Sequence, residues 1–159
     1  MKFALALVLA AGVSATSCRN PPQHVLTVRD YIASIDRLNG QRVSVGGYLS
    51  RCGGYDCALF DGKDDLQRTH DWFAAAARDH KQPNFELPEF LGIGSAAGFD
   101  ERAAPFAGRY VVITGTVDNR CRYHGKWGCT DRGPDIHPET IEAAQPPAGA
   151  PKASPERKA

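Results

Sequence analysis

Two stretches of the chain, GQRVSVGGYL at residues 40–49 and GRYVVITGTV at residues 108–117, follow the same pattern. In each, apolar residues alternate with other residues, as expected of a strand with one buried face. Each stretch also carries glycine within the strand pattern, which indicates a bulge, a bend or a close backbone approach. Two copies are too few for a solenoid. The repeat therefore predicts two equivalent bent strands in one small barrel.

An amphipathic helix is predicted over residues 27–38, directly before the first of these strands. Thr27 is a good N-cap, and Asp30 stands three residues later in the capping-box position. Asn39 and Gly40 tolerate positive φ and end the helix. Five apolar residues recur at spacings of three and four along one face: Val28, Tyr31, Ile32, Ile35 and Leu38.

The stretch between the two strands is less regular. Asp64 or Asp65 is predicted to cap a second helix, which runs to about residue 77 and ends before Pro83. Residues 85–105 are expected to form loop, with a short helical turn near residues 99–104. Further on, residues 137–139 (His-Pro-Glu) suggest a turn that enters a short terminal helix.

A short amphipathic helix followed by a strand of the form Val-x-Val-x-Gly-x-Leu, with the pattern recurring later, resembles the small OB-fold-like domains of bacterial periplasmic proteins and lipoproteins. The resemblance covers residues 25–60 and 108–136. It implies an α+β fold, with a small OB-like barrel preceded by a helix. Residues 61–107 depart from the family pattern and are expected to be a helical and loop insertion between strands. Fold alone does not assign an activity.

The first seventeen residues are interpreted as a signal peptide. Lys2 provides the positive n-region, and residues 3–13 form an apolar run of a length typical of a signal h-region. A membrane-spanning helix needs about 20 apolar residues, so this run is too short to be one. Small residues then lead to Cys18. This order resembles the lipobox of bacterial lipoproteins and implies cleavage before Cys18 and lipid on its thiol and amine.

Two details leave alternatives open at this end of the chain. Ala15 stands where the lipobox usually has a branched residue, and cleavage after Ala15 would instead give a soluble periplasmic protein. For the lipidated form, the resemblance to lipoproteins implies a sorting pattern in which Arg19 in place of aspartate favours the outer membrane, with the body facing the periplasm. We expect a lipoprotein with residues 18–24 as a short tether.

Residues 25–143 are expected to form a single domain. Residues 144–159 are rich in Pro and Ala and carry no large apolar residue, so a disordered tail is predicted. The domain keeps 14 of the 19 basic residues and 17 of the 18 acidic residues. Because nucleic-acid-binding proteins usually carry a basic excess, a nucleic-acid partner is not expected.

Cysteine parity supports an oxidising compartment. With Cys18 lipidated, four cysteines remain, namely Cys52, Cys57, Cys121 and Cys129. Disulfides are favoured over a metal site because zinc ligands usually come as repeated pairs with gaps of two to four residues. Here the gaps are four and seven residues, and 63 residues separate the two pairs. Three pairings are open. Pairing within each short loop is favoured, since each pair flanks a hairpin tip, and crossed pairing is the alternative. No metal or other cofactor is expected.

Residues 120–129 are the predicted binding segment, because three basic residues, two aromatic residues and a histidine gather there among glycines. The candidate binding residues are Arg122, Tyr123, His124, Lys126 and Trp127. The alternative is that Trp127 only covers one end of the barrel. No catalytic motif is present, so a non-enzymatic envelope protein that binds an envelope component or a protein is expected. A small periplasmic enzyme with His124 or His70 as general base is the second hypothesis.

Overall fold

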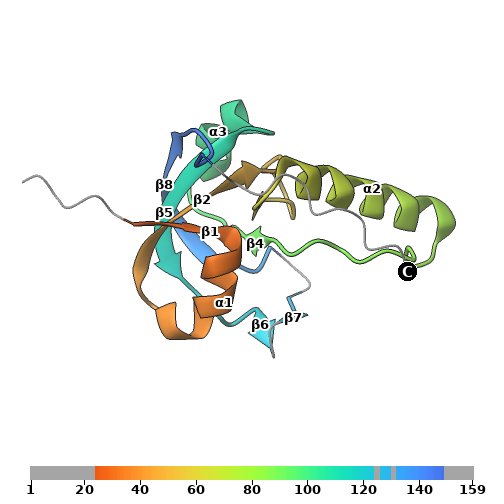
Figure 1. The fold of residues 1–159 in the computed structure, drawn as a ribbon, viewed down its shortest axis with the longest axis horizontal. Coiled ribbons are helices and arrows are strands. Elements are labelled where there is room, and N and C mark those ends of the chain that lie inside the picture. The colour runs from red at the N-terminus through yellow and green to blue at the C-terminus, as the bar shows by residue number, and fades with distance from the viewer. Residues whose placement is uncertain (1–23, 124–125, 130–131, 149–159) are drawn as a thin grey trace, which may run out of the picture.

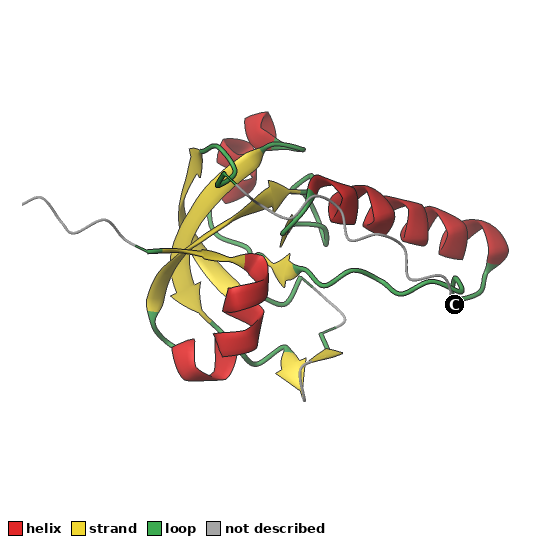
Figure 2. Ribbon diagram, viewed as in Figure 1, coloured by secondary structure: helices red, strands yellow, loops and turns green. Residues whose placement is uncertain are grey.

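The computed structural model describes residues 24–123, 126–129 and 132–148. It is α+β, as expected, and its main element is a twisted sheet (Figures 1 and 2). Five strands follow one path in the order β4-β3-β2-β5-β8, each antiparallel to its neighbours. A sixth strand, β1, pairs in parallel with β2. The strands of this sheet are β1 (Val25–Thr27), β2 (Arg42–Leu49), β3 (Ala58–Phe60), β4 (Leu91–Gly92), β5 (Tyr110–Val117) and β8 (Ile136–Ala143).

The two strands of the sequence repeat are β2 and β5, and they lie side by side. Their register pairs Arg42 with Thr116 and Tyr48 with Tyr110. The alternating residues predict one buried face, but residues 44–47 of β2 and 113–115 of β5 are buried on both faces. These two strands form the centre of the sheet, and the remaining strands extend it on either side.

The outer strands of the path approach each other. Ile93, just after β4, forms an isolated parallel bridge with Ile136 at the start of β8. The Gly94 amide donates to the Ile136 carbonyl at 2.9 Å, and the Asp135 amide donates to the Gly92 carbonyl at 2.9 Å. The two ends of the sheet are therefore joined over a short parallel contact.

Helix α1 (Val28–Leu38) begins as the sequence predicts, because the Thr27 hydroxyl accepts a 3.0 Å hydrogen bond from the Asp30 amide. Its apolar face packs on the sheet. Four residues of this face belong to the main hydrophobic core together with residues of β2, β5 and β8 and with Phe99 of α3 (Phe99–Ala103). A short 3₁₀ helix, Ala104–Phe106, follows α3. Among the described residues, none of the helices has both the length and the apolar character that crossing a bilayer requires.

Helix α2 (Lys63–Asp79) confirms the second predicted helix, although its N-cap is Gly62 and not an aspartate. Asp64 and Asp65 lie in its first turn, where their charges favour the helix dipole. The helix ends at His80, which has a positive φ of 51°. Only Leu66 and Thr69 are buried, and Figure 1 shows α2 extending away from the sheet on the side opposite to β1.

The predicted terminal helix is wrong, since residues 136–143 form strand β8. Ile136 and Pro138 are buried while His137 and Glu139 are exposed, which is the period of a strand. Pro138 is tolerated because β8 ends the sheet path and because the register shifts at its partner, between Thr114 and Gly115. A proline at the edge of a sheet is compatible with a strand, so it did not require a turn.

Candidate functional site

The predicted binding segment forms a small hairpin. Strand β6 (Arg122–Tyr123) pairs with β7 (Lys126–Trp127), so that Arg122 faces Trp127 and Tyr123 faces Lys126. A disulfide between Cys121 and Cys129 closes its base. The second disulfide joins Cys52 and Cys57, so the expected local pairing is confirmed. His124 lies outside the described residues, and for Tyr123, Lys126 and Trp127 the structure describes the backbone.

Arg122 is directed toward the body of the protein. Its guanidinium contacts both carboxylate oxygens of Asp135, at 2.9 Å from Nε and 2.7 Å from Nη2. The Arg122 side chain is 5% exposed and that of Asp135 is 0% exposed. Nη2 also donates to the Phe90 carbonyl. This candidate binding residue therefore holds the base of the hairpin.

Asp135 is the centre of a buried polar network. Its carboxylate accepts a hydrogen bond from the Gly92 amide at 2.8 Å, in addition to those from Arg122. Its backbone carbonyl accepts one from the hydroxyl of Tyr31 on α1. Burial raises the pKa of the Tyr31 hydroxyl far above its ordinary value, and the Asp135 charge adds to this effect. The network thus ties α1, the end of β4, the hairpin and the start of β8 to one another.

The other arginines of this region are also paired within the protein. Arg120 contacts Asp118, with 2.6 Å between Nη2 and Oδ2. Arg132, whose side chain is 7% exposed, forms two 2.6 Å contacts with the carboxylate of Asp100 and donates to the Ile93 carbonyl. Much of the basic character that the sequence gives this segment is therefore neutralised by carboxylates of the same chain.

A histidine–carboxylate pair lies next to the hairpin, and sequence reasoning missed it. His137 Nε2 is 2.8 Å from Asp118 Oδ2, and His137 is exposed. The pairing of Thr116 with His137 in neighbouring strands brings the histidine beside the end of β5. Apolar Ile136 and Pro138 alternate with polar His137 and Glu139, and this alternation was the signal that could have placed His137 on a strand.

The way in which the stability of the protein changes at low pH should depend on Asp118. The Arg120 guanidinium, with help from the Arg120 amide and His137, holds the pKa of Asp118 well below its ordinary value of 3.8. A lowered carboxyl pKa contributes stability above the ordinary pKa, and this contribution is lost as the pH falls toward the folded-state pKa. The melting temperature of Asp118→Asn should therefore lie below that of the wild type at pH 7 and approach it below pH 4. If the melting temperatures of the variant and the wild type differ by the same amount at pH 7, 4 and 2.5, this expectation is contradicted.

Of the two histidines considered for the enzyme hypothesis, His70 and His124, the structure describes only His70. His70 is exposed on α2, and Asp71 accepts a 3.0 Å hydrogen bond from Gln67 on the same helix. Asp65 pairs with Arg68 one turn away. These contacts are typical of the solvated surface of a helix.

The projecting part of the chain exposes aromatic side chains. Phe73 of α2 is 56% exposed and Phe85 is 40% exposed. The Trp72 indole packs edge-on against Phe73 and donates from Nε1 to the Phe85 carbonyl at 3.1 Å. This contact ties the segment that returns from the helix to α2.

Comparison with known proteins gives no family for this chain: no protein-family model matches it, and neither does any curated protein.

Proposed function

We propose that this chain is a lipid-anchored protein of the bacterial cell envelope, whose body is an OB-like barrel that binds an envelope component or a partner protein. Two disulfides support an oxidising compartment, because such bonds persist there and are rare in the cytosol. The parallel bridge between Ile93 and Ile136 supports a barrel, since it joins the two ends of the sheet path.

One observation carries the choice of binding surface. Strands β6 and β7 pair with each other and with no other described strand. The base of this hairpin is nevertheless fixed twice, by the Cys121–Cys129 disulfide and by the buried Arg122–Asp135 pair. A loop that is held rigidly at its base loses little conformational entropy on binding, which favours affinity. We propose that the hairpin binds through its aromatic residues Tyr123 and Trp127, with Arg122 as its internal support.

The test measures retention of the protein on isolated envelope fractions. Trp127→Ala should weaken retention by about tenfold or more, because tryptophan is among the residues whose truncation costs most at interfaces. All variants should carry Cys18→Ser, so that a lipid does not retain them. This background variant should itself pass into the soluble fraction of the cell while the wild type stays with the membrane.

Tyr55→Ala is a matched control. Tyr55 is 82% exposed in the tight turn between Cys52 and Cys57, which is the other disulfide-closed loop. Its truncation should leave retention unchanged. Equal retention of the Trp127→Ala variant and its parent would exclude the hairpin as the contact surface.

A further inference from the structure

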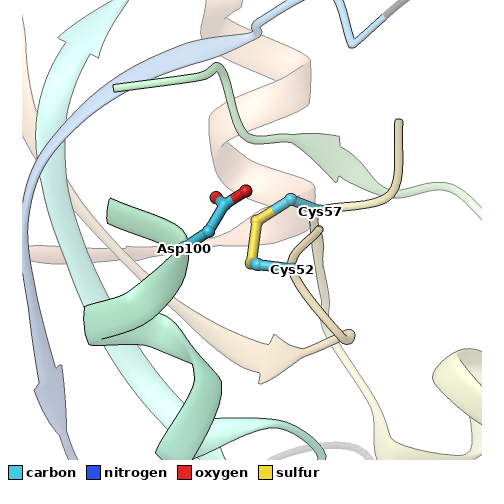
Figure 3. A group of neighbouring side chains, drawn as sticks. All are labelled: Cys52, Cys57 and Asp100. Carbon is cyan, nitrogen blue, oxygen red and sulfur yellow. A yellow bond between two sulfur atoms is a disulfide. The ribbon is translucent and has the colours of Figure 1, made fainter. Parts of the chain in front are cut away.

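A carboxylate lies beside one of the two disulfides. Cys52 and Cys57 close the turn between β2 and β3, and Asp100 comes from the first turn of α3. Figure 3 shows the Asp100 carboxylate next to the two sulfur atoms. One carboxylate oxygen and both sulfurs lie within 4.8 Å of one another. Sequence spacing could not reveal this group, because the third member comes from a separate element.

Contacts other than the disulfide hold the turn and Asp100 in place, and across the turn the Gly53 amide donates to the Asp56 carbonyl at 2.8 Å. Cys57 is 5% exposed, and its carbonyl accepts a 2.9 Å hydrogen bond from the Ile93 amide. Phe99 and Ala103 of α3 are fully buried and fix the helix against the core. Arg132 orients the Asp100 carboxylate through two 2.6 Å contacts. Opening the disulfide would therefore leave the two thiols and the carboxylate close together.

We propose that reduction of the Cys52–Cys57 disulfide creates a zinc site, in which Cys52, Cys57 and Asp100 bind one Zn²⁺. A dithiol reductant supplies the two electrons and two protons: the S–S bond breaks, two thiols form, and the reductant becomes a disulfide. Zinc then displaces both thiol protons to solvent and binds two thiolates and the carboxylate. Water fills the fourth tetrahedral position.

The ligand types favour zinc. Thiolates are soft ligands that Mg²⁺ and Ca²⁺ do not select, whereas zinc accepts sulfur and carboxylate oxygen together. Zn–S bonds of about 2.3 Å in a tetrahedral site separate two sulfurs by about 3.8 Å. The Cys52 and Cys57 sulfurs, which are bonded to each other in the disulfide, would move apart to bind one Zn²⁺.

Zinc and oxidation would then compete for the same sulfurs. Because zinc binds the dithiol and not the disulfide, it stabilises the reduced form by mass action. The midpoint potential of this pair should rise by about 30 mV for each tenfold increase in free zinc above its dissociation constant. The site would thus be zinc-loaded under reducing conditions and closed by a disulfide under oxidising ones.

The experiment isolates this pair in the full chain. With Cys18→Ser, Cys121→Ser and Cys129→Ser, the only cysteines are Cys52 and Cys57. After reduction with a phosphine, this variant should bind one Zn²⁺ per chain, and Co²⁺ in its place should give a thiolate-to-cobalt charge-transfer band. The oxidised form should bind neither ion. A chain with Cys18→Ser, Cys52→Ser and Cys57→Ser retains the other cysteine pair and should show no such site.

Two substitutions separate the role of Asp100 as a ligand from its role in an ion pair. Asp100→Asn and Arg132→Gln both break the Asp100–Arg132 pair, but only the first removes the carboxylate. Asp100→Asn should weaken zinc binding by at least about tenfold, whereas Arg132→Gln should weaken it less. Equal effects of the two substitutions, absence of the cobalt band, or the same band from the Cys121–Cys129 pair would overturn the proposal.

Discussion

Replacement of Asp135 by alanine is expected to lower the free energy of unfolding by about 3–5 kcal/mol. The substitution leaves the buried Arg122 guanidinium without the carboxylate that it contacts through two nitrogens. It also removes the acceptor of the Gly92 amide. An uncompensated buried charge is among the costliest defects in a folded protein, because little water reaches it. Chemical denaturation followed by circular dichroism would measure the loss.

A surface ion pair provides the control for this experiment. Arg42 and Glu139 are 2.7 Å apart, but their side chains are 51% and 42% exposed. Glu139→Ala should therefore cost no more than about 1 kcal/mol. Joint replacement of Arg122 by Met and Asp135 by Leu should recover much of the loss, because apolar groups can replace a buried pair. The structure indicates that the Arg122–Asp135 pair is desolvated. If Asp135→Ala lowers the free energy of unfolding as little as Glu139→Ala does, that interpretation is wrong.

Gly115→Ala is expected to be the second most damaging change, with a loss of about 3 kcal/mol at the upper end of the range for overpacking. Gly115 lies in the middle of β5 and faces Pro138 of β8 where the register shifts. A Cβ atom there would collide with the backbone carbonyl oxygen of His137 and lie 3.0 Å from Ile136 Cγ1. Since the obstacle is backbone, strand β8 would have to move. Denaturant unfolding of the variant would give the cost.

Gly46→Ala is the matched comparison in the neighbouring strand. The nearest atom to a Cβ at Gly46 is the hydroxyl of Tyr110, which is the far end of a side chain and can turn away. Alanine also restricts the unfolded chain more than glycine does, and this offsets part of the cost. We therefore expect a loss below about 1 kcal/mol at Gly46. Similar losses at both sites would mean that β8 adjusts as readily as a side chain.

Local sequence signals explain why the centre of the fold was predictable. The patterns at residues 40–49 and 108–117 require only local information, namely alternation and glycine, and they predicted β2 and β5 to within two residues. Helix α1 was equally clear, because Thr27 and Asp30 mark its start in the sequence. Signals of this kind are contained within a few residues, so they can be recognised without knowledge of the rest of the chain.

The partners of the charged residues were not predictable for the opposite reason. Arg122 was assigned to binding on the composition of its segment, but its partner Asp135 lies 13 residues away, and Phe90 lies 32 residues away. Arg132 meets Asp100 across a similar distance in sequence. A basic residue in a loop has the same local sequence whether it faces solvent or a buried carboxylate, and only the packing of α3, β4 and β8 distinguishes the two.

The position of helix α2 has a consequence for local unfolding of the protein. Its contribution to the core rests on Leu66 and Thr69 near its start, so the turns beyond Thr69 bury little that would resist their separation from the body. Native-state amide hydrogen exchange should divide the chain into two cooperative units, with slow exchange in β2 and β5 and fast exchange in the second half of α2. A protease that needs an unwound segment would accordingly cut first within residues 70–87, and the sheet should remain folded after the cut.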